Sequence, residues 1–160
     1  TDHFYDHQIA GVPLAEAFLR RLKFDNNTIK DVCKLVRWHD FGMGCVPKKN
    51  TIRKLLGEVG KDFFPYIIEI KKADMAAQSD YKLEERQSQL AELEKKYEEI
   101  VADDDCVRIK DLKVNGGDLI KLGIKPGPQM GEILQKLLDM VIEDPEKNDR
   151  EYLIEQVKMM

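Results

Sequence analysis

The stretch VNGGDLIKLGIKPGPQMGEIL, residues 114–134, holds five glycines and two prolines between two short runs that have the apolar spacing of helices. Glycine reaches backbone conformations closed to other residues, whereas proline fixes φ and removes a hydrogen-bond donor. This density of the two residues predicts a turn of defined geometry, because a loose linker would not need it. The stretch therefore predicts two helices joined by a tight turn.

Outward from this stretch, apolar residues recur at intervals of three and four along nearly the whole chain, and alternating strand patterns are almost absent. The sequence predicts an all-α protein. The expected helices cover residues 12–24, 26–39, 51–60, 63–78, 81–101, 127–144 and 148–160. We expect Asn26 or Asn27 to cap the second of these helices and Thr51 the third. In the first helix we expect a buried apolar stripe made of Val12, Leu14, Phe18, Leu19 and Leu22.

The composition, with 42% hydrophobic and 35% charged residues among 160, is ordinary for a globular protein. No apolar run approaches the roughly 20 residues of a membrane span, so we expect a cytoplasmic protein without a membrane partner. Three distant cysteines argue against a disulfide framework or a zinc ribbon. The net charge is −4, but residues 20–61 are rich in Lys and Arg while residues 80–105 are acidic. This segregation predicts one basic surface suited to a polyanion.

The patterning predicts three parts, namely a helical domain over residues 1–79, a long connecting helix over 80–105, and a helical tail over 106–160. We expect the long helix to pack on its own chain, and homo-oligomer formation through it stays open. Aromatic residues of the helical domain could offer base-stacking platforms, but on a helix they more often fill the core. We therefore interpret Trp38, Tyr5 and Tyr66 as core residues.

Three blocks resemble, in the same order, the bacterial CCA-adding enzymes, which are tRNA nucleotidyltransferases of the poly(A) polymerase family. HFYDHQIAGVPLAEAFLRRLKFDNNTIKDVCKLVRWH resembles the second half of their HD-type helical domain, and IRKLLGEVGKDFFPYIIEIKKADMAAQ resembles the block that follows. DLKVNGGDLIKLGIKPGPQMGEILQKLL resembles their C-terminal block and is the most specific of the three. The resemblance implies a tRNA partner.

The same family places a catalytic head before these blocks, with a glycine pair and an Asp-x-Asp that hold metal and nucleotide. This sequence has no such stretch. We therefore expect a C-terminal fragment of a longer protein, inactive alone and without a cofactor of its own, whose absent head binds Mg²⁺. Whether that head would add CCA, part of CCA or poly(A) is not encoded in this chain.

The opening stretch resembles a helix-hairpin-helix element of the kind that binds nucleic-acid backbones. Gly127 and Pro128 are expected to begin a second helix whose N–H groups face a phosphate, and Gly131 to let the two helices approach closely. We expect Asn115, Gly116 and Gly117 to cap the first helix, with Asp118 in its first turn. The alternative is a Gly-Pro corner that only packs two helices. The residues predicted to contact RNA are Lys121, Lys125, Gly127, Pro128 and Gln129, with Arg53 and Lys54 from the basic block.

His7, His39 and Asp74 fall on three successive helical segments, and two imidazoles with one carboxylate are a ligand set for a divalent metal. HD-type phosphohydrolases use such dispersed residues to bind a metal that activates water. A variant of this set takes His39 and Asp40 as the doublet, between His7 and Asp74. The other interpretation makes the histidines hydrogen-bonded helix residues and Asp74 a buried or capping carboxylate. Metal-dependent hydrolysis of phosphate esters is therefore the alternative function.

Overall fold

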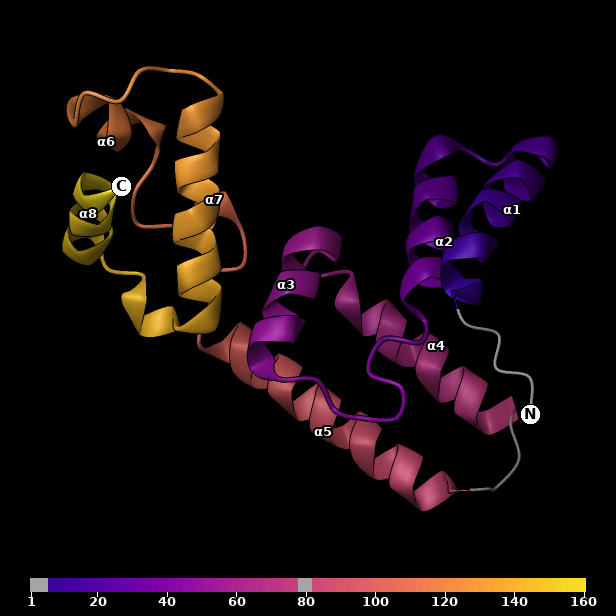
Figure 1. Cartoon of the computed structure of the whole chain (residues 1–160). Helices are drawn as coiled ribbons and strands as arrows, with labels where there is room; N and C mark the ends of the chain where they lie inside the picture. Colours follow the sequence, from indigo (N-terminus) through magenta and orange to yellow (C-terminus); the bar gives the residue numbers. More distant parts are fainter. Residues whose placement is uncertain (1–5, 78–81) are drawn as a thin grey trace. The chain divides into compact units, whose positions relative to one another are not determined.

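A computed structural model describes residues 6–77 and 82–160, and every regular element in these ranges is helical (Figure 1). The prediction of an all-α protein is confirmed. The chain forms two compact units: unit 1 comprises Thr1–Pro47 and Val59–Lys95, and unit 2 comprises Lys48–Glu58 and Lys96–Met160. The three predicted parts do not coincide with these units.

Unit 1 contains α1 (His7–Arg21), α2 (Asn26–Trp38), α4 (Phe64–Ala77) and the first part of α5 (Leu83–Ala102). The cap of α2 is Asp25, whose carboxylate accepts hydrogen bonds from the backbone N–H groups of Asn27 and Thr28. The prediction of Asn26 or Asn27 as the cap was therefore wrong by one or two residues. Both asparagines lie inside the helix, because Asp is as good a cap as Asn and stands before them.

The predicted burial of the α1 stripe is wrong. Leu14 is 72% exposed and Phe18 53% exposed, and α1 has no fully buried residue. Its partly buried side faces α2, where Cys33 Sγ lies 3.9 Å from the Val12 carbonyl oxygen. The apolar pattern thus identified the helix correctly but not how much of it is covered. Interior positions of unit 1 come instead from later elements, with Phe64 and Ile67 fully buried.

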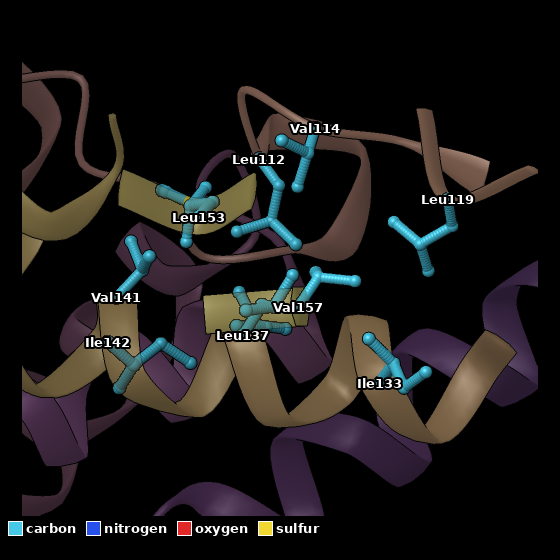
Figure 2. Packing of buried hydrophobic residues seen from close by; sticks show 11 residues of the cluster. Leu112, Val114, Leu119, Ile133, Leu137, Val141, Ile142, Leu153 and Val157 are labelled. Atoms are coloured by element: carbon cyan, nitrogen blue, oxygen red, sulfur yellow. The ribbon is translucent and has the colours of Figure 1, made fainter. Parts of the chain in front are cut away.

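Unit 2 contains most of α3 (Lys49–Val59), the last residues of α5, and α6 (Gly116–Lys121), α7 (Pro128–Glu143) and α8 (Arg150–Met159). Thr51 does not cap α3, which begins two residues earlier. Figure 2 shows the core of this unit, where the inner face of α7 meets side chains from α6, α8 and the segment before α6. Its buried members are Cys106, Leu112, Val114, Leu119, Ile133, Leu137, Leu138, Val141, Ile142, Leu153 and Val157.

A buried ion pair holds α3 within unit 2. Arg53 Nε donates to Asp105 Oδ2 at 2.7 Å, and Arg53 Nη1 donates to the Ile142 carbonyl oxygen at 3.1 Å. Both charged side chains are less than a tenth exposed. Burying two charges is tolerated here because each is paired and hydrogen-bonded. Within the described ranges, none of the helices combines the length and the apolarity that crossing a membrane requires.

Candidate functional site

The glycine-rich stretch forms two helices, α6 and α7, joined by a turn, as predicted. Asn115 caps α6, and its Oδ1 accepts hydrogen bonds from the N–H groups of Gly117 at 2.8 Å and Asp118 at 3.3 Å. Asp118 Oδ2 in turn accepts the N–H of Asn115 at 3.1 Å, which completes a capping box. The predicted cap is confirmed for Asn115, whereas Gly116 and Gly117 lie inside the helix, and the first-turn position of Asp118 is confirmed.

Asp118 also ties α6 to α8. It is 8% exposed, and its Oδ1 accepts a hydrogen bond from the Arg150 guanidinium. The pKa of Asp118 lies below its usual value, chiefly because its carboxylate accepts the Asn115 N–H, with a further contribution from the charge of Arg150. The carboxylate is therefore ionised at neutral pH and fixes the start of the turn unit.

Gly123 ends α6 with positive φ, 87°. The N–H of Gly123 bonds the Ile120 carbonyl at 2.9 Å, and the N–H of Ile124 bonds the Leu119 carbonyl at 3.1 Å. This pair of bonds is a Schellman motif, in which Ile124 also packs against the core that contains Leu119. The turn is thus held at the end of α6 by backbone geometry.

The start of α7 is open to solvent. Residues 125–129 are all exposed, Gly127 provides the cap position without a side chain, and Pro128 is the first helical residue. Helix-initiating N–H groups that lack a side-chain cap can bind an anion. Gly127 has φ 160°, which is extended backbone, and a Cβ built on it would meet nothing within 4 Å. Gly127 therefore leaves room for a ligand but is not required by the fold.

The predicted role of Gly131 is wrong, because a Cβ at this position would also meet nothing within 4 Å. The close contact lies instead at Gly116, where an added Cβ would stand 2.9 Å from the Met130 sulfur. The spacing of glycines showed that the helices meet. It could not show which glycine faces the partner.

The predicted RNA-contacting cations fall into two groups. Lys121, with its side chain 79% exposed, lies on α6 close to the turn that carries exposed Lys125. Lys54 pairs with Glu143 at the far end of α7, which is roughly 24 Å from the start of this helix at 1.5 Å per residue. The prediction that Arg53 contacts RNA does not fit its burial against Asp105. Lys121 and Lys125 therefore lie at or near the turn, whereas Arg53 and Lys54 of α3 do not.

Unit 1 brings two of the predicted metal ligands together. His7 starts α1 and His39 follows α2, and their Nε2 atoms lie 3.1 Å apart. The carboxylate of Asp40 lies 2.9 Å from His7 Nε2 and 3.3 Å from His39 Nε2. Among the described residues the group consists of His7, His39 and Asp40, as in the variant that took His39 and Asp40 as the doublet, but without Asp74.

The three side chains fit a divalent transition metal. Zinc–nitrogen bonds of about 2.0–2.1 Å place neighbouring ligand atoms of a tetrahedral site about 3.3 Å apart, close to the separations found. His39 Nδ1 lies 2.7 Å from the Val36 carbonyl oxygen, so this nitrogen carries the proton and leaves the Nε2 lone pair toward the group. Two imidazoles and one carboxylate would leave open positions for water.

A pocket of about 90 Å³ adjoins His39 and is lined by the apolar side chains of two methionines and two leucines, together with Lys71, Asp74, Arg86 and Gln89. Lys71 Nζ lies 3.4 Å from the His39 carbonyl oxygen. Burial lowers the pKa of Lys71, and the negative charges of Asp40 and Asp74 oppose that shift. Lys71 is not among the site residues predicted from the sequence, although it stands one helical turn before Asp74 in α4 and this spacing indicates a shared helix face.

Comparison with known proteins identifies the family of this chain. The family model of tRNA nucleotidyltransferase domain 2 matches residues 9–157. A CCA-adding enzyme of Limosilactobacillus fermentum is 50% identical over 44 residues, which are 28% of this chain and 11% of that protein. A CCA-adding enzyme of Ligilactobacillus salivarius is 46% identical over 52 residues, which are 32% of this chain and 13% of that protein.

The aligned segments thus span little more than a tenth of each relative, and no solved structure gave a significant match. The family model covers nearly the whole chain, both units included. The earlier resemblance to tRNA nucleotidyltransferases is confirmed by this match. The chain therefore belongs to the tRNA nucleotidyltransferase domain 2 family.

Proposed function

We propose that unit 2 binds the sugar–phosphate backbone of tRNA through the turn between α6 and α7. The observation that carries this proposal is the exposure of residues 125–129, which comprise the turn with Lys125, the cap position Gly127 without a side chain, and the first two residues of α7. Family membership supplies the class of nucleic acid, since its relatives are named CCA-adding enzymes.

The chemistry of such a contact is backbone recognition. Pro128 has no N–H, and the N–H of Met130 bonds the Gly127 carbonyl oxygen at 3.0 Å, so the N–H of Gln129 is the donor of the first turn of α7 that faces a phosphate oxygen. Lys121 and Lys125 add positive charge nearby. None of these groups reads a base edge, so affinity depends on charge and on the shape of the RNA. The turn thus recognises the folded shape of tRNA and binds tRNAs of different sequence with equal affinity.

In this proposal, nucleotide addition at the tRNA 3′ end belongs to a catalytic head supplied by a longer protein, with Mg²⁺ bound there. The chain has no glycine pair followed by Asp-x-Asp that would hold metal and nucleotide. Its own residues bind and orient the tRNA. The addition of CCA, of part of CCA or of poly(A) is decided by that head.

Fluorescence anisotropy with labelled tRNA tests the proposal directly. The purified chain is titrated against several tRNAs and a hairpin of unrelated sequence, at several salt concentrations. We expect similar affinities for the different tRNAs and a linear fall of log K with log salt. Absence of binding at low salt, or strong preference for one base sequence, would refute backbone recognition.

A second candidate function rests on the group formed by His7, His39 and Asp40. We infer that these three residues bind a divalent transition metal, because their ligand atoms all lie within 4.8 Å of one another. When bound, a metal there would supply a Lewis acid and an activated water for hydrolysis of a phosphate ester. The chain's own residues hold the ligand geometry and, through Lys71, place a cation on the neighbouring pocket wall.

Calorimetric titration with Zn²⁺ and Mn²⁺ tests whether the site binds a metal and which residues are its ligands. His39→Ala and Asp40→Asn are expected to weaken metal binding strongly, because each removes one of three ligands. Asp74→Asn is the matched control and is expected to keep the affinity of the parent. Equal binding by the parent and His39→Ala would exclude the site, and metal-dependent release of phosphate from p-nitrophenyl phosphate would show that it is hydrolytic.

A further inference from the structure

An aromatic pair lies at the start of α4 in unit 1, where Phe63, just before the helix, is half-buried and Tyr66 is exposed. The ring centroids of Phe63 and Tyr66 are 5.7 Å apart with the planes tilted by 54°, and Tyr66 is 60% exposed. The interpretation of Tyr66 as a core residue is therefore wrong. The opposite holds for Phe64, the next residue after Phe63, which is fully buried. An aromatic ring left in water beside a second ring offers a flat apolar surface.

One cation of α2 contacts this pair, and two more share the same face of that helix. Lys34 Nζ lies 4.6 Å from the centroid of the Phe63 ring, which fixes the face of α2 that is turned toward it. Lys30 and Arg37, both exposed, stand four residues before and three residues after Lys34 and so share that face. Arg37 in addition lies over the ring of Trp38, with its guanidinium carbon 5.4 Å from the centroid.

The acidic residues near this surface are fewer. Asp31 lies 3.6 Å from Lys34 Nζ in an exposed pair, and Asp62 precedes Phe63 and is exposed. Exposed pairs of this kind are weak and are exchanged readily for another anion. Glu69 stands one helical turn after Tyr66, is exposed and pairs with Lys72 at 3.1 Å. Lys30, Lys34, Arg37 and Lys61 against Asp31, Asp62 and Glu69 leave an excess of one positive charge around Phe63 and Tyr66.

We propose that Tyr66 and Phe63 form a stacking site for an unpaired RNA base, with Lys34, Lys30 and Arg37 binding the adjoining phosphates. Base stacking on aromatic rings beside a basic surface is the general chemistry of single-strand binding and tolerates any base. A protein partner fits less well, since lysine is depleted at protein–protein interfaces. The inference rests on the proposed function in taking RNA as the ligand, but it concerns unit 1 and a single strand.

The test uses the full chain and a fluorescein-labelled single-stranded 12-mer of uridine, with a hairpin RNA as the second ligand. Tyr66→Ala is expected to weaken 12-mer binding about 5- to 100-fold, the cost of one lost stacking contact. Tyr66→Phe should bind like the parent, because only the ring is needed. Lys34→Ala should weaken binding less and lower the salt slope by about 0.7, since one phosphate contact is lost.

Phe18→Ala is the matched control, because Phe18 is 53% exposed and has the Arg21 guanidinium carbon 5.3 Å above its ring. It is expected to leave 12-mer binding unchanged, and an equal loss in this variant would overturn the proposal as non-specific. Thermal melts establish that each variant is folded. We expect Tyr66→Ala to stay folded, because Tyr66 is exposed.

The outcomes separate this site from the tRNA contact of unit 2. Unchanged 12-mer binding by folded Tyr66→Ala would overturn the stacking site, whether or not tRNA binds through the α6–α7 turn. If the parent binds the 12-mer but not tRNA, and Tyr66→Ala loses the 12-mer, the stacking site stands and the proposed function falls. A change of self-association in Tyr66→Ala with RNA binding intact would assign the surface to protein contacts and overturn the proposal.

Discussion

Single charged residues in unit 2 differ in their energetic role according to burial. Arg53 and Asp105 are enclosed and hydrogen-bonded, whereas the pair of Lys54 and Glu143, one residue further along α3, is more than half exposed. Adjacent positions in the basic block therefore have opposite uses, one in packing and one at the surface. Sequence alone treats both as cations of one block.

Arg53→Ala is expected to lower the free energy of unfolding by about 3–5 kcal/mol, because it leaves Asp105 buried without its partner. Lys54→Ala is the control and should cost less than about 1 kcal/mol, since its pair is exposed to water. Urea unfolding followed by circular dichroism measures both. Equal small losses in the two variants would contradict the structural role assigned to Arg53.

Asp118 should make the stability of the chain depend on pH. Its pKa is lowered in the folded state, so its stabilising effect is present above the unfolded value of about 3.9 and is lost as the pH falls through the folded value. Asp118→Asn should be less stable than the parent at pH 7, and the difference should shrink below about pH 4. Melting temperatures across pH 2.5–7 test this, and a constant difference throughout would contradict it.

At the scale of elements, the turn between α6 and α7 is determined by short-range signals. The cap at Asn115 and the end of α6 at Gly123 both follow from residues within a few positions of each other. Such local chemistry is why the sequence predicted this turn and its flanking helices. The same reasoning placed the start of α7 at Gly127 and Pro128, and the helix begins at Pro128 with Gly127 as its cap position.

Glycine substitutions at the two ends of the turn should have opposite effects. Gly123→Ala is expected to destabilise by about 1 kcal/mol, because alanine is strained at φ 87°. Gly131→Ala should stabilise by about 0.5–1 kcal/mol, since it lies inside α7 with open space around it. Chemical denaturation of both variants measures the two changes. Stabilisation by Gly123→Ala would contradict the Schellman motif.

What the sequence could not predict depends on contacts between distant residues. The exposure of Leu14 and Phe18 reflects how little of α1 is covered, which the helical period does not encode. The choice of Asp40 over Asp74 beside the two histidines likewise depends on where α2 ends. Burial of Arg53 required knowing that Asp105 and the end of α7 lie against α3.

At the scale of the whole molecule, the two units carry different sets of candidate contacts. Unit 2 offers a backbone contact at the α6–α7 turn, and unit 1 offers the histidine group and the aromatic surface at Tyr66. The basic block of residues 20–61 and the acidic block of residues 80–105 each contribute to both units. In the two proposals, unit 2 contacts folded RNA and unit 1 an unpaired base.

The central claim, that the α6–α7 turn holds the tRNA backbone, is tested by tRNA titrations over a salt series with three variants. Lys125→Ala should weaken binding equally for all tRNAs and lower the salt slope by about 1, because one charge is lost. Gly127→Val should weaken binding with little change in slope, because its side chain occupies the open space where a phosphate would approach and the fold tolerates it. Lys158→Ala, an exposed cation on α8, is the control and should bind like the parent. If Lys125→Ala and Gly127→Val both stay folded and bind tRNA as the parent does, the turn only packs two helices and the claim is contradicted.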